Sequence, residues 1–498
     1  MAERRVAAIV AIAGLLALGG VADRTSASRP PIAPAPPAVP VAAPAGALAS
    51  SWLCAGATGS SGGAAAGVLV VANPSPRPVD GTVTMMPSNH AALAPRPFQV
   101  GAGSRLAIPE SVPDGAPWLG AAVVVYGGGV AVEQQVSGTL GLAATPCATA
   151  GAPQWYFPTG STLRGSTDVV SLLNPYPADA IVDFSFVTDQ GAEAPTAFQA
   201  LVVPSRTMLA VDLGTHLRRR TTIATTVSVR TGQVVAWQTQ VSSPPAPGTA
   251  VVGGPAPAGA GTGPLDPALP TGGVVLTLGA PSLGVRWWWP DSATGGGVTE
   301  QFVVYNPGRA AAQLRLSYGS GTAEAQAEPV TVGPASVVTV TTTAQSEPAA
   351  GGASDVTLNS TNGVPVVAAR SVTALAPSSR TGLGVLLGGR MAAPRWLLAA
   401  GGATSHFDEW VEVQDPGPAP AQVSLSEVAA GGLQPLGGLQ GLAVPAGGRV
   451  AVRVADHVAQ PFGAALVVSA TTPVVVERDI YTAGGLGIGL ATGVPLAS

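Results

Sequence analysis

Acidic side chains form the densest group of potentially reactive residues in this sequence. Asp408, Glu409, Glu412 and Asp415 stand close together, with His406 just before them. Paired carboxylates act as acid and base in glycoside hydrolysis, and carboxylate oxygens also bind calcium. If the stretch is a strand, neighbouring side chains point to opposite faces, so Asp408 and Glu412 share a side with His406. Only part of the group could therefore form one site.

A structural role explains one of these positions better. An acidic residue stands six positions before a strand-ending Asn or Asp at Asp168, Glu300 and Glu409, whereas an earlier copy of the pattern has Gly67 there. A position repeated in three copies favours a hydrogen-bonding or edge-protecting element over one active site. We therefore expect no catalytic residue. A calcium site and a glycan hydrolase that uses the acidic strand remain the alternatives.

The sequence lacks the residue spacing that a metal site or a catalytic nucleophile requires. The histidines His90, His216, His406 and His457 are scattered, and no pair has the spacing of metal ligands. Residues 59–63 satisfy the G-x-S-x-G pattern of hydrolase nucleophiles, but the preceding strand and following helix are missing. We predict a turn there, and neither a metal site nor a cofactor.

Cys54 and Cys147 are the only cysteines, and 93 residues separate them. In an oxidising compartment, a bridge that closes such a loop contributes on the order of 4 kcal/mol to the free energy of unfolding in the chain-entropy model. We predict this disulfide. Two unpaired buried thiols are the alternative.

Aromatic runs are the most plausible binding features. On an extended strand Trp287 and Trp289 face one way and Trp288 the other, so the three cannot enter one core. Packing between modules is the favoured interpretation, and burial in a core or stacking on a sugar ring are the alternatives. The candidate binding residues are Trp155, Tyr156, Arg164, Trp287, Trp288 and Trp289.

Composition excludes several classes of function. Charged residues make up 10% of the 498 residues, the formal net charge is −4, and every basic residue is an arginine. Without lysine there is no phosphate-loop lysine, Schiff base or Ser-Lys pair. Without a clustered basic surface, we expect no nucleic-acid partner.

The N-terminus has the order of an export signal. Arg4 and Arg5 precede an uncharged stretch at 6–21, and small polar residues follow it. We predict a secretory signal peptide, or an uncleaved signal anchor as the alternative. The chain would then lie outside the cytoplasmic membrane, in the cell envelope or beyond, and would touch the membrane only through an uncleaved anchor. The Pro/Ala-rich residues after the signal predict an extended spacer.

A pattern recurs four times along the remaining chain. Each copy has a Trp, an alternating strand that ends in Asn-Pro or Asp-Pro, a later Val-rich strand, and a tail strand, clearest at 380–389 and 483–493. The Trp residues are Trp52, Trp155, Trp287 and Trp396, and the strand-ending residues are Asn73, Asn174, Asn306 and Asp415. These two sets lie 21, 19, 19 and 19 residues apart, and a spacing held over four copies indicates tandem modules.

Short alternating strands with frequent Gly and Pro turns predict an all-β fold of four immunoglobulin-like β-sandwich modules. The Cys-Trp-Cys pattern of antibody domains is missing, so only the sandwich class is inferred. The predicted order is a signal segment or anchor helix at 1–28, a linker at 29–50, modules at 51–150 and 151–243, a Pro/Gly-rich hinge at 244–272, and modules at 273–390 and 391–498.

The stretch from Pro146 to Gly165 resembles an uncharacterised family of exported or membrane-anchored actinobacterial proteins with repeated β-sandwich modules. The resemblance rests on Cys147, on the run from Trp155 to Pro158, and on Arg164-Gly165. It extends over nearly the whole chain after the signal segment and implies an envelope location. The family carries no assigned activity, so the resemblance implies no chemistry.

We therefore expect a non-enzymatic cell-envelope protein that acts as a structural or protein-binding scaffold. Its partners would be envelope proteins or cell-wall glycan. An envelope glycan-binding array is the first alternative, and a glycan hydrolase using carboxylates of the fourth module is the second.

Overall fold

The structure is a computed structural model. It describes residues 39–497 apart from 61, 89–91, 113–115, 244–271, 320–325, 344–352, 402–406 and 459–462. The predicted signal segment, residues 29–38 of the predicted linker and nearly all of the predicted hinge lie outside the described residues, as do His90 and His406.

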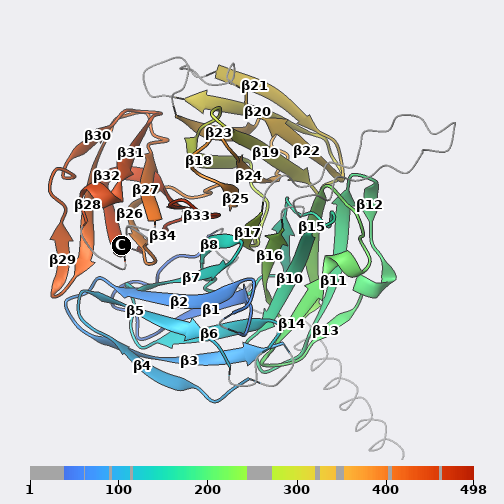
Figure 1. Cartoon of the computed structure of the whole chain (residues 1–498), viewed down its shortest axis with the longest axis horizontal. Helices are drawn as coiled ribbons and strands as arrows, with labels where there is room; N and C mark the ends of the chain where they lie inside the picture. Colours follow the sequence, from blue (N-terminus) through green and yellow to red (C-terminus); the bar gives the residue numbers. More distant parts are fainter. Residues whose placement is uncertain are drawn as a thin grey trace, which may run out of the picture. The chain divides into compact units, whose positions relative to one another are not determined.

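The prediction of an all-β fold is confirmed (Figure 1). The described residues form antiparallel sheets, and their only helical turns are η1 (Thr196–Phe198), η2 (Leu213–Thr215) and η3 (Val454–Asp456). None of the described helices is long and apolar enough to cross a membrane. Four consecutive stretches of chain supply the sheets, and we call them segments 1 to 4: residues 50–146, 154–278, 286–387 and 393–495.

Segment 1 contains two four-stranded sheets. The first has the order β1 (Ser50–Ala57), β6 (Leu119–Val125), β3 (Val79–Pro87), β4 (Arg96–Val100). The second has the order β5 (Ser104–Glu110), β2 (Ala66–Asn73), β7 (Ala131–Gly138), β8 (Gly141–Pro146).

Segment 2 repeats this arrangement. One sheet has the order β9 (Gln154–Phe157), β15 (Ile223–Thr231), β11 (Ala180–Thr188), β12 (Gly191–Glu193), and β13 (Leu201–Val203) also pairs with β11. The other has the order β14 (Thr207–Asp212), β10 (Ser166–Asn174), β16 (Val235–Ser242), β17 (Gly273–Leu278).

Segment 3 has the same two orders. They are β18 (Arg286–Ser292), β23 (Ser354–Ser360), β20 (Ala312–Gly319), β21 (Gln326–Val332), and β22 (Ser336–Thr341), β19 (Val298–Asn306), β24 (Val367–Ala374), β25 (Gly382–Leu387).

In segment 4 one long strand, β32 (Leu466–Thr482), serves both sheets. Its residues 466–470 pair with β28 and its residues 475–482 pair with β27. The remaining strands are β26 (Ala393–Leu398), β27 (Phe407–Gln414), β28 (Ala421–Ala429), β29 (Gly432–Pro435), β30 (Leu442–Val444), β31 (Arg449–Arg453), β33 (Ile488–Thr492) and β34 (Val494–Pro495).

The two sheets of a segment pack face to face around a shared apolar core. In segment 3 the ring of Trp289 from one sheet meets Phe302 from the other at 5.0 Å between centroids. Strand β20 shows the alternation that allows this packing. It buries Leu314 and Leu316 and exposes Gln313 between its apolar positions. This period of two gives each strand one face toward the core.

The four strand-ending residues are turn-forming groups. Asn306 donates from Nδ2 to the carbonyls of Ala310 (2.8 Å) and Gly333 (2.9 Å), while its Oδ1 accepts from the amide of Gly308 (2.9 Å). Asn73 repeats this pattern in segment 1. The buried side chain therefore satisfies backbone groups that the turn leaves open.

The tail strands of the four segments pack against one another in a closed circuit (Figure 1). Strand β8 contacts β17 and β33, and β25 contacts the same two strands. Glycine permits the close approach, because a Cβ on Gly384 would lie 2.7 Å from Cγ2 of Ile488. A Cβ on Gly489 would likewise lie 2.5 Å from Cδ1 of Leu142.

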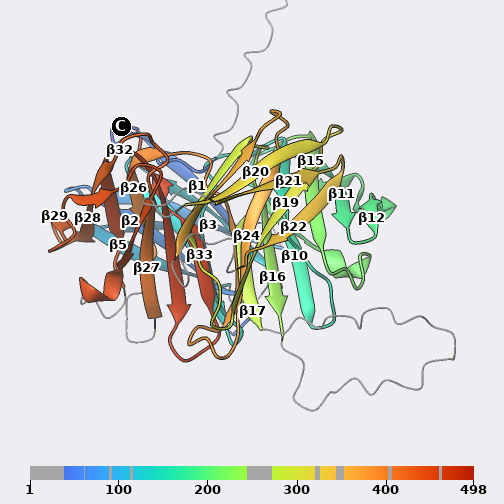
Figure 2. The same cartoon turned by 90° about the horizontal axis from the view of Figure 1, so that it is seen from above.

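Strand pairing places one predicted boundary differently. Residues 273–278 were predicted to begin the third module, but they form β17, which pairs with β16 of segment 2. Figure 2 shows β10, β16 and β17 side by side. The predicted hinge therefore interrupts segment 2 between its last two strands instead of dividing two modules.

Candidate functional site

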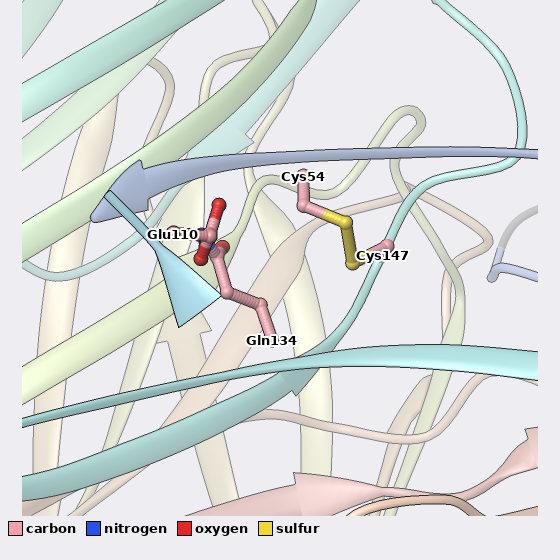
Figure 3. Close-up of a disulfide and its surroundings, with 4 residues drawn as sticks. All are labelled: Cys54, Glu110, Gln134 and Cys147. Carbon is pink, nitrogen blue, oxygen red and sulfur yellow. A yellow bond between two sulfur atoms is a disulfide. The ribbon is translucent and has the colours of Figure 1, made fainter. Parts of the chain in front are cut away.

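The predicted disulfide is present in segment 1. Cys54 on β1 and Cys147, just after β8, are bridged with 4.9 Å between their Cα atoms. Both cysteines are fully buried. The bridge ties the first strand to the tail strand, close to the buried polar pair Glu110 and Gln134 (Figure 3).

Most of the predicted aromatic site residues lie in cores. Trp155, Trp287 and Trp289 are at most 2% exposed. The indole of Trp155 donates to the carbonyl of Val234 at 3.0 Å, and that of Trp289 donates to Leu386 at 3.3 Å. These rings hold their sheets together and offer no face to a ligand.

The other predicted site residues differ in exposure. Trp288 is half-buried, and the guanidinium of Arg286 lies 5.7 Å from its ring centroid. Arg164 is exposed. The opposite orientations of Trp287 and Trp288 agree with the strand geometry, but the structure does not gather the predicted residues into one site. Only Tyr156 lines a groove.

The repeated acidic position is buried in every segment that has it. Asp168, Glu300 and Glu409 are at most 1% exposed. In segment 1 the carboxyl group comes from the neighbouring strand instead, because Glu110 pairs opposite Gly67. A Cβ on Gly67 would lie 2.3 Å from Oε2 of Glu110, so the glycine makes room for that carboxyl group.

A polar partner stands at one repeated position on the later strand. Gln134, Gln238, Arg370 and Arg478 each pair opposite the residue four before the strand-ending Asn or Asp. Gln134 donates to Oε2 of Glu110 at 2.8 Å, and Gln238 donates to Oδ1 of Asp168 at 2.9 Å. The first two segments thus bury an acid with an amide, whereas the last two place an arginine there.

Burial raises the pKa values of these carboxyl groups. The pKa of Glu110 rises to about 8, and that of Asp168 to about 7, because burial penalises the ionised form more than the amide hydrogen bonds favour it. Burial also raises the pKa of Glu300 to about 7, although Arg370 opposes the shift. These acids hold protons near neutral pH.

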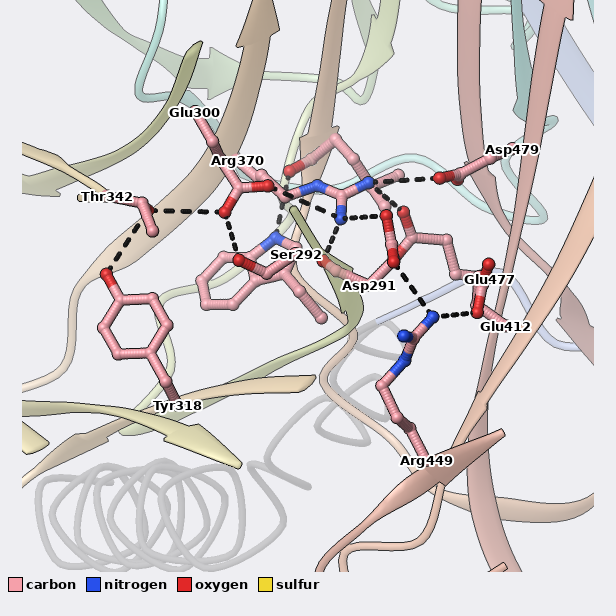
Figure 4. A network of polar contacts seen from close by, with 12 residues as sticks. Asp291, Ser292, Glu300, Tyr318, Thr342, Arg370, Glu412, Arg449, Glu477 and Asp479 are labelled. Carbon is pink, nitrogen blue, oxygen red and sulfur yellow. Dashed lines mark hydrogen bonds and ion pairs between the residues drawn. The ribbon is translucent and has the colours of Figure 1, made fainter. Parts of the chain in front are cut away.

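Arg370 lies at the centre of a network between segments 3 and 4 (Figure 4). From segment 4, Glu477 Oε1 lies 2.5 Å and Asp479 Oδ2 lies 3.5 Å from its Nη2. From segment 3, Asp291 Oδ2 lies 3.4 Å and Glu300 Oε2 lies 3.9 Å from its Nη1. Burial alone would lower the pKa of Arg370, but the surrounding carboxylates, Glu477 first, raise it well above its usual value.

A second arginine extends this network. Arg449 on β31 bonds to Glu412 and lies 2.9 Å from Oδ1 of Asp291 in segment 3. Nearby, Gln414 donates to Oδ2 of Asp355 at 2.7 Å, again from segment 4 to segment 3. The Arg449–Asp291 and Gln414–Asp355 contacts join segments 3 and 4 across their boundary.

The network carries more carboxyl groups than guanidinium groups. Two arginines face five carboxyl groups, which are Asp291, Glu300, Glu412, Glu477 and Asp479. Burial raises the pKa of Glu412, Glu477 and Asp479. Some of these groups therefore carry protons, which balances charge that two arginines leave uncompensated.

A buried ion pair joins segments 4 and 1. Arg478 Nη2 lies 2.5 Å from Oε2 of Glu133, and both side chains are fully buried. The other carboxylate oxygen accepts from the amide of Ala399 at 2.8 Å. Charge-assisted bonds from side chain and backbone together compensate the buried carboxylate.

The acidic strand of segment 4 does not form one cluster. Asp408 bonds to Arg453 at 2.6 Å, Glu412 bonds to Arg449, and Asp415 accepts from the amide of Gly417 at 2.8 Å. No group of three metal-binding side chains occurs in the part of the chain that the structure describes.

A groove of about 460 Å³ lies between segments 2 and 3. Tyr156 and Tyr305 line it, and their hydroxyls are fixed by Gln154 and Thr226, the latter at 2.9 Å. Burial raises the pKa of both tyrosines, and each tyrosine stays neutral. Amides, hydroxyls and ring edges line the groove.

Sequence reasoning missed the residues that join segments. An isolated charged residue in a Val-rich strand belongs to no motif, so the sequence does not single out Glu133, Arg370 or Arg478. A usable signal existed: the amide and arginine positions follow the strand-ending residues by 61, 64, 64 and 63. That regular spacing predicts that the four side chains take equivalent places in their segments. It does not predict which other segment each side chain contacts.

Comparison with solved structures gives distant similarities. The crystal structure of Thermotoga maritima 1070 shares 17% identity, with a TM-score of 0.20, over 22% of this chain and 95% of that one. A tetra-tandem repeat from the extending region of a large adhesion protein shares 8% identity, with a TM-score of 0.11, over 90% of this chain and 99% of that one. No curated protein matches the chain.

One family model matches part of the chain. It covers residues 111–249, which begin late in segment 1 and continue past β16 of segment 2. The match agrees with the predicted resemblance to an uncharacterised family. Residues 111–249 match the model of the family of unknown function DUF5719.

Proposed function

We propose that this protein is a non-enzymatic scaffold of the cell envelope, built from four immunoglobulin-like sandwich modules that act as one rigid block. The repeated strand orders of segments 1 to 4 support the four modules. The closed circuit of tail strands supports rigidity, because a linear string of modules would leave its first and last members apart.

The observation that supports the proposal best is the burial of ion pairs between segments. The ion pairs Arg370–Glu477 and Arg478–Glu133 are almost fully buried, and each joins two segments. An active site instead needs its charged groups at an opening that substrate can enter. These buried ion pairs therefore connect the segments of the block, as expected for a protein that positions its partners.

Export is part of the proposal. The basic, apolar and small-polar order of the N-terminus supports it, and a disulfide persists best in an oxidising compartment. Envelope proteins and cell-wall glycan are the proposed partners, and the few scattered basic residues argue against nucleic acid.

A co-sedimentation experiment with isolated cell walls tests the proposal. The purified, disulfide-bonded chain should sediment with the walls saturably and should release no reducing ends. Release of reducing ends that Glu412→Gln abolishes, with an unchanged fold, would overturn the proposal in favour of a glycan hydrolase. Asp189→Asn, an exposed carboxyl group in a turn, is the matched control.

Glycan binding is the second candidate function. The predicted tryptophans that are buried do not support this candidate. Its support is Tyr156, which lines the groove between segments 2 and 3. Sedimentation with protein-stripped walls favours this candidate, whereas sedimentation that requires wall proteins favours the protein-binding scaffold.

A further inference from the structure

The groove between segments 2 and 3 has the size and chemistry of a small-ligand site. Its volume of about 460 Å³ lies in the range of pockets that hold small molecules. Tyr156 comes from the edge strand β9, and Tyr305 comes from the end of β19. Ligand would therefore contact both segments at once.

The charge of the groove excludes ionic ligands. Glu193 is the only charged side chain among the described residues that line it. Its Oε1 lies 2.9 Å from Nη2 of Arg220 and accepts from the hydroxyl of Thr188 at 2.9 Å. The carboxylate is thus already compensated, and the groove presents no net charge to a ligand.

The backbone of the groove is closed to an added peptide strand. Tyr156 on edge strand β9 donates its amide to Ala280 at 2.9 Å and accepts from the amide of Ala280 at 3.0 Å. A peptide that binds by strand addition needs such groups free. The groove is lined by polar side chains: the hydroxyl of Ser185, the amide group of Gln154, which accepts from Tyr156, and the hydroxyls of Thr226 and Tyr305, which bond to each other.

Ordered neutral hydrogen-bonding groups beside aromatic rings suit one class of ligand. Hydroxyl-rich sugar rings bind through amide and hydroxyl groups and pack their C–H faces against aromatic edges and apolar surface, here the half-buried Leu283 and Pro307. We propose that this groove binds a neutral pyranose oligosaccharide of two to four units. The inference deepens the glycan-binding candidate and does not depend on the scaffold role.

Calorimetric titration of the full chain with maltotetraose, cellotetraose and α-1,6-mannotetraose tests the inference. At least one should bind saturably, and Ser185→Trp should weaken it at least tenfold by filling the groove from an exposed position on β11. Ser137→Trp, on the exposed part of β7, is the matched control and should bind normally.

A second variant, Tyr156→Phe, keeps the ring and removes the hydroxyl. It should weaken binding several-fold while its circular dichroism and melting temperature stay close to those of the unmodified chain. Binding of none of the three saccharides, equal binding by Ser185→Trp, or preferential binding of an extended peptide or a uronic-acid oligosaccharide would overturn the inference. A failure here leaves wall sedimentation intact if the scaffold proposal is right.

Discussion

At the scale of single residues, polar groups occupy the position that each later strand repeats. In the first two segments an amide pairs with a carboxyl group, and in the last two an arginine stands at the same place. A buried polar pair adds little stability by itself, but a register slip would leave its groups unpaired at a cost of about 1–3 kcal/mol each. The amide–acid pairs of segments 1 and 2 therefore favour the observed strand register, and the arginine pairs favour the observed contacts between segments.

The buried acids give the protein an unusual dependence on pH. Folding raises the pKa of Glu110 from its ordinary 4.5 to about 8, so the folded state holds a proton that the unfolded state releases. Stability is then complete below about pH 4.5 and falls as pH rises toward 8. Asp168, Glu300 and Asp355, with pKa values of about 7, 7 and 6, act in the same direction.

Replacing Glu110 with Gln tests the predicted direction of this pH dependence of stability. Glu110→Gln keeps an acceptor for Gln134 and cannot ionise, so the variant should match the unmodified chain at pH 5 and exceed its stability at pH 8.5 by more than about 1 kcal/mol. Urea unfolding at the two pH values measures the difference. An equally steep loss in the variant, or any gain from the exposed control Asp189→Asn, would contradict the account.

Arg370 is predicted to matter more than surface arginines. Arg370→Met leaves buried carboxylates without their partner and should lower the free energy of unfolding by about 3–5 kcal/mol at pH 8. The loss should shrink at pH 5, because protonated carboxyl groups need no counter-charge. Arg230→Met is the control: Arg230 pairs with Asp183 at the surface, where such pairs contribute about 0–1 kcal/mol. Equal losses from the two variants would refute the distinction.

Sequence pattern predicted some of these residues and could not predict others. The acid at Asp168, Glu300 and Glu409 follows from its fixed distance to the strand end, and its burial agrees with a structural role. The pairing of Arg478 with Glu133 joins residues 345 positions apart, so local periodicity carries no information about it. Trp155, Trp287 and Trp289, three of the candidate binding residues, lie in the cores, where their large rings pack.

At the scale of elements, the tail strands decide how the segments assemble. Val275 of β17 and Val385 of β25 lie in one small apolar cluster with Ala369. Gly384 brings β25 close to Ile488 on β33. Small residues and glycine thus allow the sheets of different segments to approach along their last strands.

A larger side chain at Gly384 should separate two tail strands. Gly384→Val places atoms where Ile488 already lies and should lower the free energy of unfolding by about 1–3 kcal/mol. Gly437→Val is the control, because a Cβ there meets nothing within 4 Å. Chemical denaturation compares the two variants, and an equal effect would show that the close approach is unimportant.

Element boundaries were predictable only where partners are near in sequence. The strands that end at Asn73, Asn174 and Asn306 were visible from their alternation and their turn residues. The sequence pattern groups β17 with the third predicted module, whereas β17 pairs with β16. A long Pro/Gly-rich insertion separates the two strands, and pairing across such an insertion leaves no local pattern. The turn function of the strand-ending asparagines likewise required the structure.

At the scale of the whole molecule, residues 37–498 form one compact unit. Segment 1 meets segment 4 through the Arg478–Glu133 pair and through the contact of β8 with β33. The isolated bridge between Ala42 and Leu496 adds another contact between the two ends of this unit. Closure of first segment on last is what distinguishes a rigid block from a flexible array.

Differential scanning calorimetry of the full chain measures this property directly. The account predicts one unfolding transition, with calorimetric and van't Hoff enthalpies that agree to within about 10%, as expected for a two-state process. Glu133→Gln should move the whole transition to lower temperature without splitting it. Two or more separable transitions in the unmodified chain would contradict the account, because they would show that the segments unfold independently.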